Sequence, residues 1–176
     1  MQDPISYLKH QIADVPDFPK PGIIFKDFTP LLRDPKTLAL AVELMANPFR
    51  GEKVDLVIGA ESRGFIFGIA IAQLIGAGFV PVRKPGKLPR KKITKEYTLE
   101  YGTDRVEMHT DAIEPGQRVI LVDDLLATGG TMLACAEMVA SLRPQIVGVS
   151  VLIELTFLNG RERLTPYGQV HSVLTY

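Results

Sequence analysis

Residues 119–131 read VILVDDLLATGGT, and this stretch decides the fold. Its first four residues are apolar without polar alternation, which is typical of a central parallel strand that is buried on both faces. Asp123 and Asp124 follow at the carboxyl end of this strand, which in an open α/β sheet faces the ligand crevice. We expect a helix to begin near Gly130, with its free N–H groups and positive dipole end facing an anion. The stretch therefore predicts a strand-to-helix turn that binds a phosphorylated sugar.

A plainer explanation of the same residues exists. An ordinary βα turn with Thr128 as the N-cap of the helix would show a similar pattern. The stretch differs from the two common nucleotide loops, because no lysine follows the glycines as in GxxxxGK[ST] and the glycines are not spaced as GxGxxG. On these residues alone, a phosphate-binding turn and a plain turn both stay open.

Apolar segments along the rest of the chain alternate between strand and helix patterns. We expect strands at 54–58, 78–83, 118–122, 146–153 and 169–174, and helices at 4–12, 37–47, 63–75 and 132–142. This alternation predicts an α/β fold with a central parallel sheet, flanking helices and right-handed crossovers. The length of 176 residues, without repeats or linkers, predicts a single domain over 1–176.

Two other segments carry different patterns. The segment 15–35 contains five prolines, and we expect an irregular loop there that forms an N-terminal flap. The segment 84–95 is expected to be a basic loop, since its prolines and glycine prevent a helix. Period-two alternation in 96–102, followed by 104–109, predicts a hairpin that rises over the site and excludes water.

The composition excludes several classes of protein. Twenty basic and twenty acidic side chains cancel, so no global field attracts nucleic acid or an anionic membrane, and we expect neither as a partner. The single cysteine, Cys135, cannot form an internal disulfide, and its apolar surroundings predict a buried side chain in a reducing, cytoplasmic compartment. The sequence contains no signal-peptide core and no apolar run of about 20 residues. The three histidines lack the spacing of zinc ligands.

A second strand-to-helix turn is predicted at residues 58–65, IGAESRGF. If it opens onto the same crevice, Arg63 and a second set of backbone N–H groups face the acidic pair. Two anion sites would then flank one cavity, as a substrate with phosphate at one end and pyrophosphate at the other requires. The alternative is that Arg63 is a surface residue paired with Glu61.

A run of cations follows the strand expected at 78–83. It comprises Arg83, Lys84, Lys87, Arg90, Lys91 and Lys92. A solvated loop is the usual meaning of such a run, and contact with nucleic acid is another. At the end of a parallel strand these cations could also reach the crevice and neutralise a leaving pyrophosphate.

Six segments of the chain together resemble the type I phosphoribosyltransferases, and among them the members that act on adenine. They are PDFPKPGIIFKDFTPLL, GAESRGFIFG, VRKPGKLPR, YTLEYG, EPGQRVILVDDLLATGGT and ELTFLNGRERL, and they cover nearly the whole chain. The resemblance implies a five-stranded parallel core, a small hood formed largely by 1–35 with part of the C-terminal segment, and a flexible hairpin lid. It also implies the reaction of adenine with 5-phosphoribosyl 1-pyrophosphate (PRPP) to AMP and pyrophosphate, with Mg²⁺ carried by PRPP or pyrophosphate, in a homodimer.

The resemblance also assigns roles to residues of the crevice. It implies that Ala127, Thr128, Gly129, Gly130 and Thr131 hold the 5′-phosphate. Asp123 and Asp124 would accept hydrogen bonds from the ribose hydroxyls and stabilise positive charge as the C1 bond to pyrophosphate stretches. Glu61, Ser62 and Arg63 correspond to the pyrophosphate turn, and Arg83, Lys84 and Lys87 match basic positions near it.

The resemblance further implies a base site and a catalytic lid pair. Phe25 would stack on one face of adenine and Leu155 pack on the other, while backbone groups of Ile24 and Lys26 read its edge. Lys26 departs from many relatives, which carry arginine there. Glu100 and Tyr101 match the lid pair, in which Glu100 takes or relays the N7 proton. Transfer to another purine, or a regulator that binds nucleotide without turnover, are the alternatives.

Overall fold

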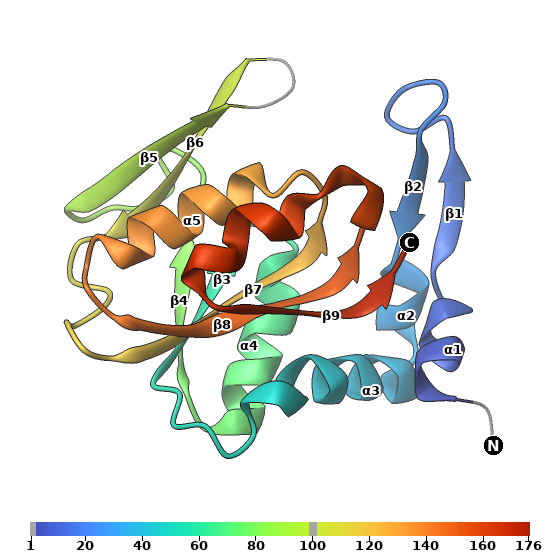
Figure 1. The fold of residues 1–176 in the computed structure, drawn as a ribbon, viewed down its shortest axis with the longest axis horizontal. Coiled ribbons are helices and arrows are strands. Elements are labelled where there is room, and N and C mark those ends of the chain that lie inside the picture. Colours follow the sequence, from blue (N-terminus) through green and yellow to red (C-terminus); the bar gives the residue numbers. More distant parts are fainter. Residues whose placement is uncertain (1–2, 99–101) are drawn as a thin grey trace. The chain divides into compact units, whose positions relative to one another are not determined.

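The computed structural model describes residues 3–98 and 102–176, and the chain divides into two compact units, Met1–Leu44 and Met45–Tyr176. Figure 1 shows both as a ribbon. The first unit contains α1 (Pro4–Lys9), β1 (Ala13–Pro16), β2 (Ile24–Asp27), α2 (Thr29–Arg33) and the greater part of α3 (Pro35–Ala46). The second contains the central sheet and its helices.

In the first unit, the expectation of an irregular segment at 15–35 is wrong in part. Strands β1 and β2 pair antiparallel from Ala13↔Asp27 to Pro16↔Ile24, and α2 follows. The prolines are compatible with these elements because Pro16 is the last residue of its strand, while Pro30 lies in the first turn of α2. Helix α1 ends at Lys9 rather than near 12, since the chain then enters β1. Asp3 is its N-cap residue, and Asp3 Oδ2 accepts a hydrogen bond from the Ser6 amide at 2.9 Å.

The second unit has a five-stranded parallel sheet in the order β4-β3-β7-β8-β9, which confirms the predicted fold class. Its strands are β3 (Leu56–Ala60), β4 (Gly78–Val82), β7 (Arg118–Leu126), β8 (Gln145–Glu154) and β9 (Gln169–Thr175). The helices are η1 (Asn47–Phe49), α4 (Gly64–Ile75), α5 (Gly130–Ala140), η2 (Thr156–Leu158) and η3 (Gly160–Tyr167). Within residues 3–98 and 102–176, no helix is long and apolar enough to cross a membrane.

The chain order of the sheet determines where a ligand crevice opens. The connection through α4 leads from β3 outward to β4, whereas the connection through α5 leads from β7 in the opposite direction to β8. Right-handed crossovers in opposite directions place the two helices on opposite faces, and in Figure 1 α5 lies in front of the sheet and α4 behind it. The strand order therefore reverses between β3 and β7, and ligands bind outside the carboxyl ends of strands at such a point.

The predicted hairpin is confirmed, but it begins earlier than expected. Strands β5 (Lys92–Thr98) and β6 (Thr103–His109) pair antiparallel, so residues 92–95 are strand rather than basic loop. Its base joins the central sheet through two backbone hydrogen bonds between Arg83 and Glu107, at 2.8 and 2.7 Å. The hairpin therefore starts directly beside the end of β4.

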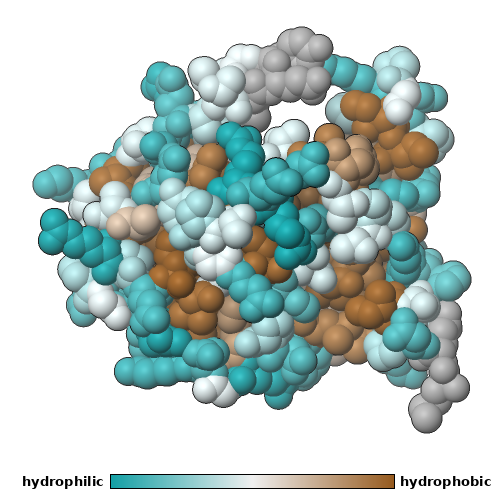
Figure 2. All heavy atoms as spheres, in the orientation of Figure 1, coloured by the Kyte–Doolittle hydropathy of each residue, from teal (hydrophilic) through white to brown (hydrophobic). Residues whose placement is uncertain are grey.

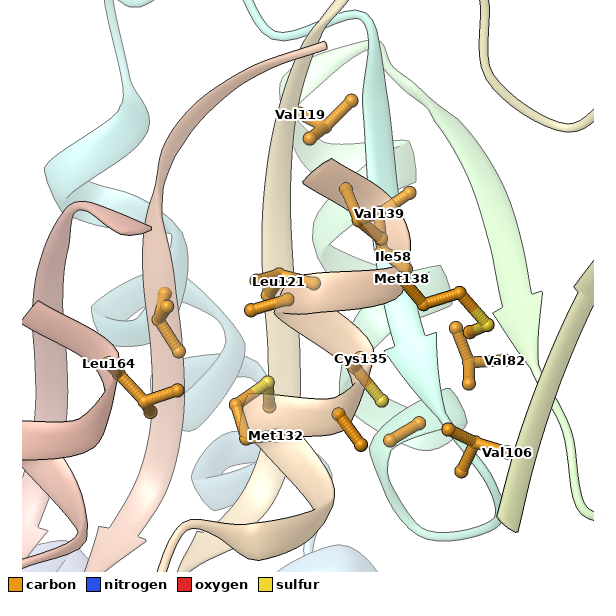
Figure 3. Close-up of a cluster of buried hydrophobic side chains, with 14 of the residues drawn as sticks. Ile58, Val82, Val106, Val119, Leu121, Met132, Cys135, Met138, Val139 and Leu164 are labelled. Carbon is orange, nitrogen blue, oxygen red and sulfur yellow. The ribbon is translucent and has the colours of Figure 1, made fainter. Parts of the chain in front are cut away.

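The core of the second unit lies between the sheet and α5. In Figure 3 the side chains of Cys135, Met138 and Val139 on α5 lie near Leu121 of β7 and Ile58 of β3. Cys135 is 1% exposed, as expected, and burial raises the pKa of its thiol. On the face drawn in Figure 2, hydrophilic side chains predominate and hydrophobic ones gather in patches. Phe67, on α4, is fully buried and packs in the interior.

Candidate active site

A cavity of about 380 Å³ lies where the sheet order reverses, outside the carboxyl ends of β3 and β7. Most of the residues that the sequence singled out are in its wall. The lining consists of Glu61, Ser62, Arg63, Lys84, Asp123, Asp124, Leu125, Leu126, Ala127, Thr128, Gly129, Gly130, Thr131 and Met132. Both strand-to-helix turns therefore open onto one cavity, as the sequence predicted.

The acidic pair lies within β7 rather than after it, because the strand continues to Leu126. Asp123 is partly accessible from the cavity, whereas Asp124 is 5% exposed. Asp124 Oδ2 lies 2.9 Å from Arg63 Nη2, but this ion pair lacks the alignment of a hydrogen bond. Asp124 Oδ2 is thus a buried oxygen that lies against the Arg63 guanidinium without a hydrogen bond.

The electrostatic environment raises the pKa of both carboxyls. For Asp123 the main cause is burial, and the neighbouring negative charge of Asp124 adds to it. For Asp124 burial also raises the pKa, against the opposing effect of the Arg63 guanidinium. Both groups therefore resist ionisation, and a ligand with hydroxyl donors or positive charge would stabilise their ionised forms.

This raised pKa makes a prediction about stability. The pKa of the Asp123 carboxyl is higher in the folded state than its usual value of 3.8. As the pH rises from the usual pKa to the raised pKa, such a carboxyl progressively lowers the free energy of unfolding. Asp123→Asn removes this effect, so the melting temperature of the variant should exceed that of the parent at neutral pH. The difference should shrink as the pH falls toward about 4, the ordinary range of an aspartate. Calorimetry at several pH values checks this, and a variant less stable at every pH would contradict it.

The glycine-containing turn begins a helix, as predicted. Gly129 is the N-cap residue of α5 with φ +78°, and no side chain caps the helix, so the alternative with Thr128 as N-cap is wrong. The first intrahelical hydrogen bond runs from the Leu133 amide to Gly129 O at 2.8 Å. The preceding amides have no acceptor within the helix, and they lie in the cavity wall. This is the geometry of an anion site.

In the turn before α4, the alternative interpretation that Arg63 is paired with Glu61 is wrong. Glu61 does not pair with Arg63: its carboxylate accepts hydrogen bonds from Arg83 Nε at 3.0 Å and from the Lys84 amide at 2.7 Å. The hydrogen bond from Arg83 is the main cause that lowers the pKa of Glu61. Since Glu61 neutralises Arg83, the guanidinium of Arg63 is directed to the acidic pair instead.

Of the three basic residues expected near pyrophosphate, only Lys84 lines the cavity. Arg83 is held by Glu61, and Lys87 lies one turn further along the loop, where its amide donates to Lys84 O at 3.4 Å. The more distant cation Arg90 forms an exposed ion pair with Asp111. The cavity thus presents two cations, Arg63 and Lys84, among its described lining residues.

Other predicted site residues lie outside this wall. Leu155 follows β8, and its amide donates to Leu126 O at 2.9 Å. Ile24, Phe25 and Lys26 belong to β2 of the first unit. There the Phe25 ring packs edge-on against Phe18 at 5.2 Å, and Lys26 pairs with Asp14 at 2.6 Å. Glu100 and Tyr101 lie outside the described residues.

The structure adds four residues that the sequence did not single out. A Cβ atom on Gly160 would lie 2.2 Å from Ala127 O, so η3 begins in direct contact with the turn at residues 127–129. Arg163 Nη1 donates to Thr128 O at 3.2 Å. Tyr97 and Asp104 of the hairpin contact Lys84. The segment ELTFLNGRERL carried a signal for Gly160 and Arg163 only through resemblance, because nothing in it indicates which loop it contacts.

Comparison with known proteins agrees with this geometry. Residues 29–174 match the family model described as a phosphoribosyl transferase domain. The chain is 56% identical over 169 residues to the adenine phosphoribosyltransferase of Geobacter metallireducens, covering 96% of this chain and 98% of that protein. It is 55% identical to that of Rhodopirellula baltica, covering 96% and 82%.

Solved structures of adenine phosphoribosyltransferases also superpose on this chain. The adenine phosphoribosyltransferase of Rhodothermus marinus superposes with a TM-score of 0.93 at 51% identity, with 98% of each chain covered. The enzyme of Saccharomyces cerevisiae, solved with an imino-altritol bisphosphate and adenine, superposes with a TM-score of 0.91 at 39% identity, covering 97% of this chain and 98% of that one. The sheet order, the two turns on one cavity and these similarities show that the chain belongs to the adenine phosphoribosyltransferase family of type I phosphoribosyltransferases.

Proposed function

We propose that this protein transfers the 5-phosphoribosyl group of PRPP to N9 of adenine, giving AMP and pyrophosphate in purine salvage. The observation that carries this proposal is the acidic pair of β7, which shares one cavity with the helix-start anion site and with the cations Arg63 and Lys84. A sugar with one phosphate and one pyrophosphate group matches this distribution of charge. The names of the relatives supply the identity of the base.

We assign the 5′-phosphate to the turn from Ala127 to Thr131. The free amides at the start of α5 donate hydrogen bonds to phosphate oxygens, and the positive end of the helix dipole lowers the energy of the dianion. Gly129 adopts a left-handed conformation there, which favours glycine. The bound phosphate fixes one end of the substrate and thereby positions the reacting carbon in the cavity.

We assign the ribose to Asp123 and Asp124. The carboxylates accept hydrogen bonds from the two ring hydroxyls, and the partly accessible Asp123 in the cavity wall is suited to this role. As the C1 bond to pyrophosphate stretches, positive charge develops on the ribose ring. A preorganised negative charge next to that ring then stabilises the transition state more than the ground state.

We assign the leaving pyrophosphate to Arg63, Lys84 and the turn at Glu61 and Ser62. These cations stabilise the negative charge that accumulates on the leaving group, which is the main contribution proteins make to such displacements. Arg83 and Lys87 act at longer range in this proposal, since Arg83 is ion-paired with Glu61. Closure of the hairpin excludes water from the reacting carbon.

We assign adenine to the segment Ile24, Phe25 and Lys26, with Leu155 on the opposite face of the base. Backbone groups of Ile24 and Lys26 would read the edge that bears the amine, and a 6-oxo purine leaves such groups unpaired. Glu100 and Tyr101 are proposed as the lid pair, with Glu100 taking or relaying the N7 proton while N9 attacks.

Magnesium is proposed as the metal of the reaction. Mg²⁺ prefers oxygen ligands and binds through one or two carboxylates together with substrate phosphates, so the partly accessible Asp123 fits it. Among the described residues, no three His, Cys, Asp or Glu side chains are grouped to hold a metal ion. We therefore propose that the pyrophosphate oxygens would hold most of the magnesium coordination, and that the metal would supply positive charge next to the leaving group.

One assay tests the proposed function. AMP formation is measured from adenine, PRPP and magnesium, with a chelator as the control, and the same assay is repeated with hypoxanthine and guanine. We expect AMP only with magnesium, and a kcat/KM for adenine well above that for either 6-oxo purine. A preference for hypoxanthine or guanine would assign the protein to another purine, and binding of PRPP without any turnover would make it a regulator.

We further propose that the protein is a cytoplasmic homodimer. A single buried cysteine is typical of a reducing compartment. Three apolar side chains of α4, Ile66, Ile69 and Leu74, are exposed by 40–47%, and a second copy could cover them. Sedimentation equilibrium tests the dimer, and a monomer at micromolar concentration would contradict it.

A further inference from the structure

Three residues at the free end of the described hairpin and the end of β4 form one polar cluster. Tyr97 of β5 and Asp104 of β6 are cross-strand partners. Both contact the ammonium group of Lys84: Asp104 forms a short ion pair with it, and Tyr97 Oη lies 3.0 Å from Lys84 Nζ. Tyr97 Oη also donates to Asp104 Oδ2 at 3.0 Å. One carboxylate of the hairpin thus neutralises a cation of the cavity wall.

The same tyrosine reaches the other anion site. Thr131 Oγ1, in the first turn of α5, donates to Tyr97 Oη at 3.2 Å. A Cβ atom on Gly130 would lie 3.5 Å from Thr98 O and 3.7 Å from the Tyr97 ring, so the hairpin packs against the start of α5. The hairpin end therefore contacts a residue of each anion site, Lys84 on one side and Thr131 on the other.

The protonation states support a strong ion pair. The Lys84 pKa is raised: burial, the largest influence, lowers it, but the hydrogen bonds to Asp104 and Tyr97 and the charge interactions with them together outweigh burial. The Asp104 pKa is lowered, mainly by the hydrogen bond from Lys84. Both groups are charged near neutral pH. The negative charge of Asp104 therefore already balances the positive charge of Lys84 when an anion enters the cavity.

The base of the hairpin is held by other contacts that do not involve the cavity. Glu107 accepts a hydrogen bond from the Gly86 amide at 3.1 Å and pairs with Lys92 at 3.1 Å. Lys95 pairs with Glu137 of α5 at 2.7 Å. The contacts of Lys84 can therefore change without releasing the hairpin from its base.

We propose that Asp104 is an internal counter-ion of Lys84 that the pyrophosphate group must replace, so that this carboxylate weakens the affinity of the cavity for pyrophosphate. The inference rests on the proposed function only in naming pyrophosphate as the anion. The two anions compete for one ammonium group, and a carboxylate that stayed beside it would repel the phosphoryl oxygens. Asp104 is a positioning residue, since it acts through Lys84.

The test compares Asp104→Asn with Asp111→Asn. Both variants remove one negative charge, but Asp111 pairs with the exposed Arg90 and does not line the cavity. Because the pair of Lys84 with Asp104 is partly exposed, we expect Asp104→Asn to tighten pyrophosphate binding by about two- to fivefold. Asp111→Asn should leave the Kd unchanged. The probe is inorganic pyrophosphate with magnesium, measured by calorimetry, and thermal unfolding verifies that both variants are folded.

Structural damage would weaken binding, so a tighter complex distinguishes this role from a merely structural one. The double variant Lys84→Met/Asp104→Asn should bind pyrophosphate no more tightly than Lys84→Met alone, because the carboxylate acts only through the ammonium. Unchanged or weaker binding by Asp104→Asn, tightening that persists without Lys84, or a parent protein that binds no pyrophosphate would overturn the inference. A parent that binds pyrophosphate but forms no AMP would contradict the proposed function and leave this result standing.

Discussion

With Asp123 and Asp124 both replaced by asparagine, kcat is expected to fall by about three orders of magnitude, the effect of losing preorganised charge beside a reacting centre. Asparagine keeps the shape of the side chain and can still accept hydrogen bonds from ribose hydroxyls. What it lacks is negative charge next to the ring as the C1 bond stretches. The loss should therefore appear in kcat more than in the KM for PRPP.

The fold should survive this double substitution. Burial raises the pKa of both carboxyls, so ionising them costs folding free energy that the amides do not. We expect the circular dichroism spectrum to be unchanged and the melting temperature to be no lower than that of the parent. Steady-state AMP formation at saturating PRPP and adenine gives kcat for comparison.

The matched control removes two carboxylate charges elsewhere. Glu52→Gln/Asp111→Asn changes the net charge equally, and both residues form exposed ion pairs outside the cavity. Its kcat should stay within a factor of about two of the parent, because exposed pairs contribute little. If Asp123→Asn/Asp124→Asn kept a tenth or more of the activity, the carboxylates would not lie beside the reacting carbon.

Segments with one dominant local signal were predictable from sequence. The run 119–122 is apolar at every position, and it lies in the buried centre of β7. The helix from Gly130 begins where the glycines predict it. At 15–35 the local signals conflict, since the prolines oppose regular structure while Ile24 and Phe25 favour a strand. The segment forms a strand because β2 pairs with β1. The propensities of single residues do not predict this pairing.

The candidate site shows the same division. Residues near the carboxyl ends of the buried strands, such as Asp123, Asp124 and Arg63, could be placed because the ends of parallel strands meet at one edge. The sequence did not allow us to predict which cation pairs with which carboxylate. Arg63 and Glu61 are near neighbours in sequence, yet Glu61 binds Arg83 of the adjacent strand end and Arg63 turns to Asp124. Ion pairing depends on the packing of β3 beside β4, which only the folded chain defines.

Gly160→Ala is expected to have the second large effect, a loss of about a hundredfold in kcat/KM for PRPP, the scale expected when reacting groups are misplaced by about 1 Å. The backbone of Gly160 does not require glycine, since its φ is not in the left-handed region. The constraint is steric: the new methyl group would lie 2.2 Å from Ala127 O and 3.0 Å from the Gly129 amide. Either the turn at residues 127–129 or η3 must therefore move.

The surroundings indicate that the turn would move. Arg161, the next residue, bonds Glu154 through Nε at 2.9 Å and Ser172 through Nη2 at 2.8 Å. Glu154 is 4% exposed, and the hydrogen bond from Arg161 is the main cause that lowers its pKa. Because this charged cluster holds the start of η3 in place, the added methyl group should displace residues 127–129 and their amides instead.

Two ligands separate this effect from general damage. Gly160→Ala should weaken binding of ribose 5-phosphate by about tenfold or more, since its anchoring amides move, while binding of pyrophosphate to Arg63 and Lys84 stays within about twofold. Gly76→Ala is the matched control: Gly76 caps α4 at φ +73° with nothing within 4 Å of the added atom. It should lower stability by about 1 kcal/mol without changing either Kd. Equal weakening of both ligands by Gly160→Ala would mean that the whole cavity is distorted, and no weakening would show that η3 yields before the turn does.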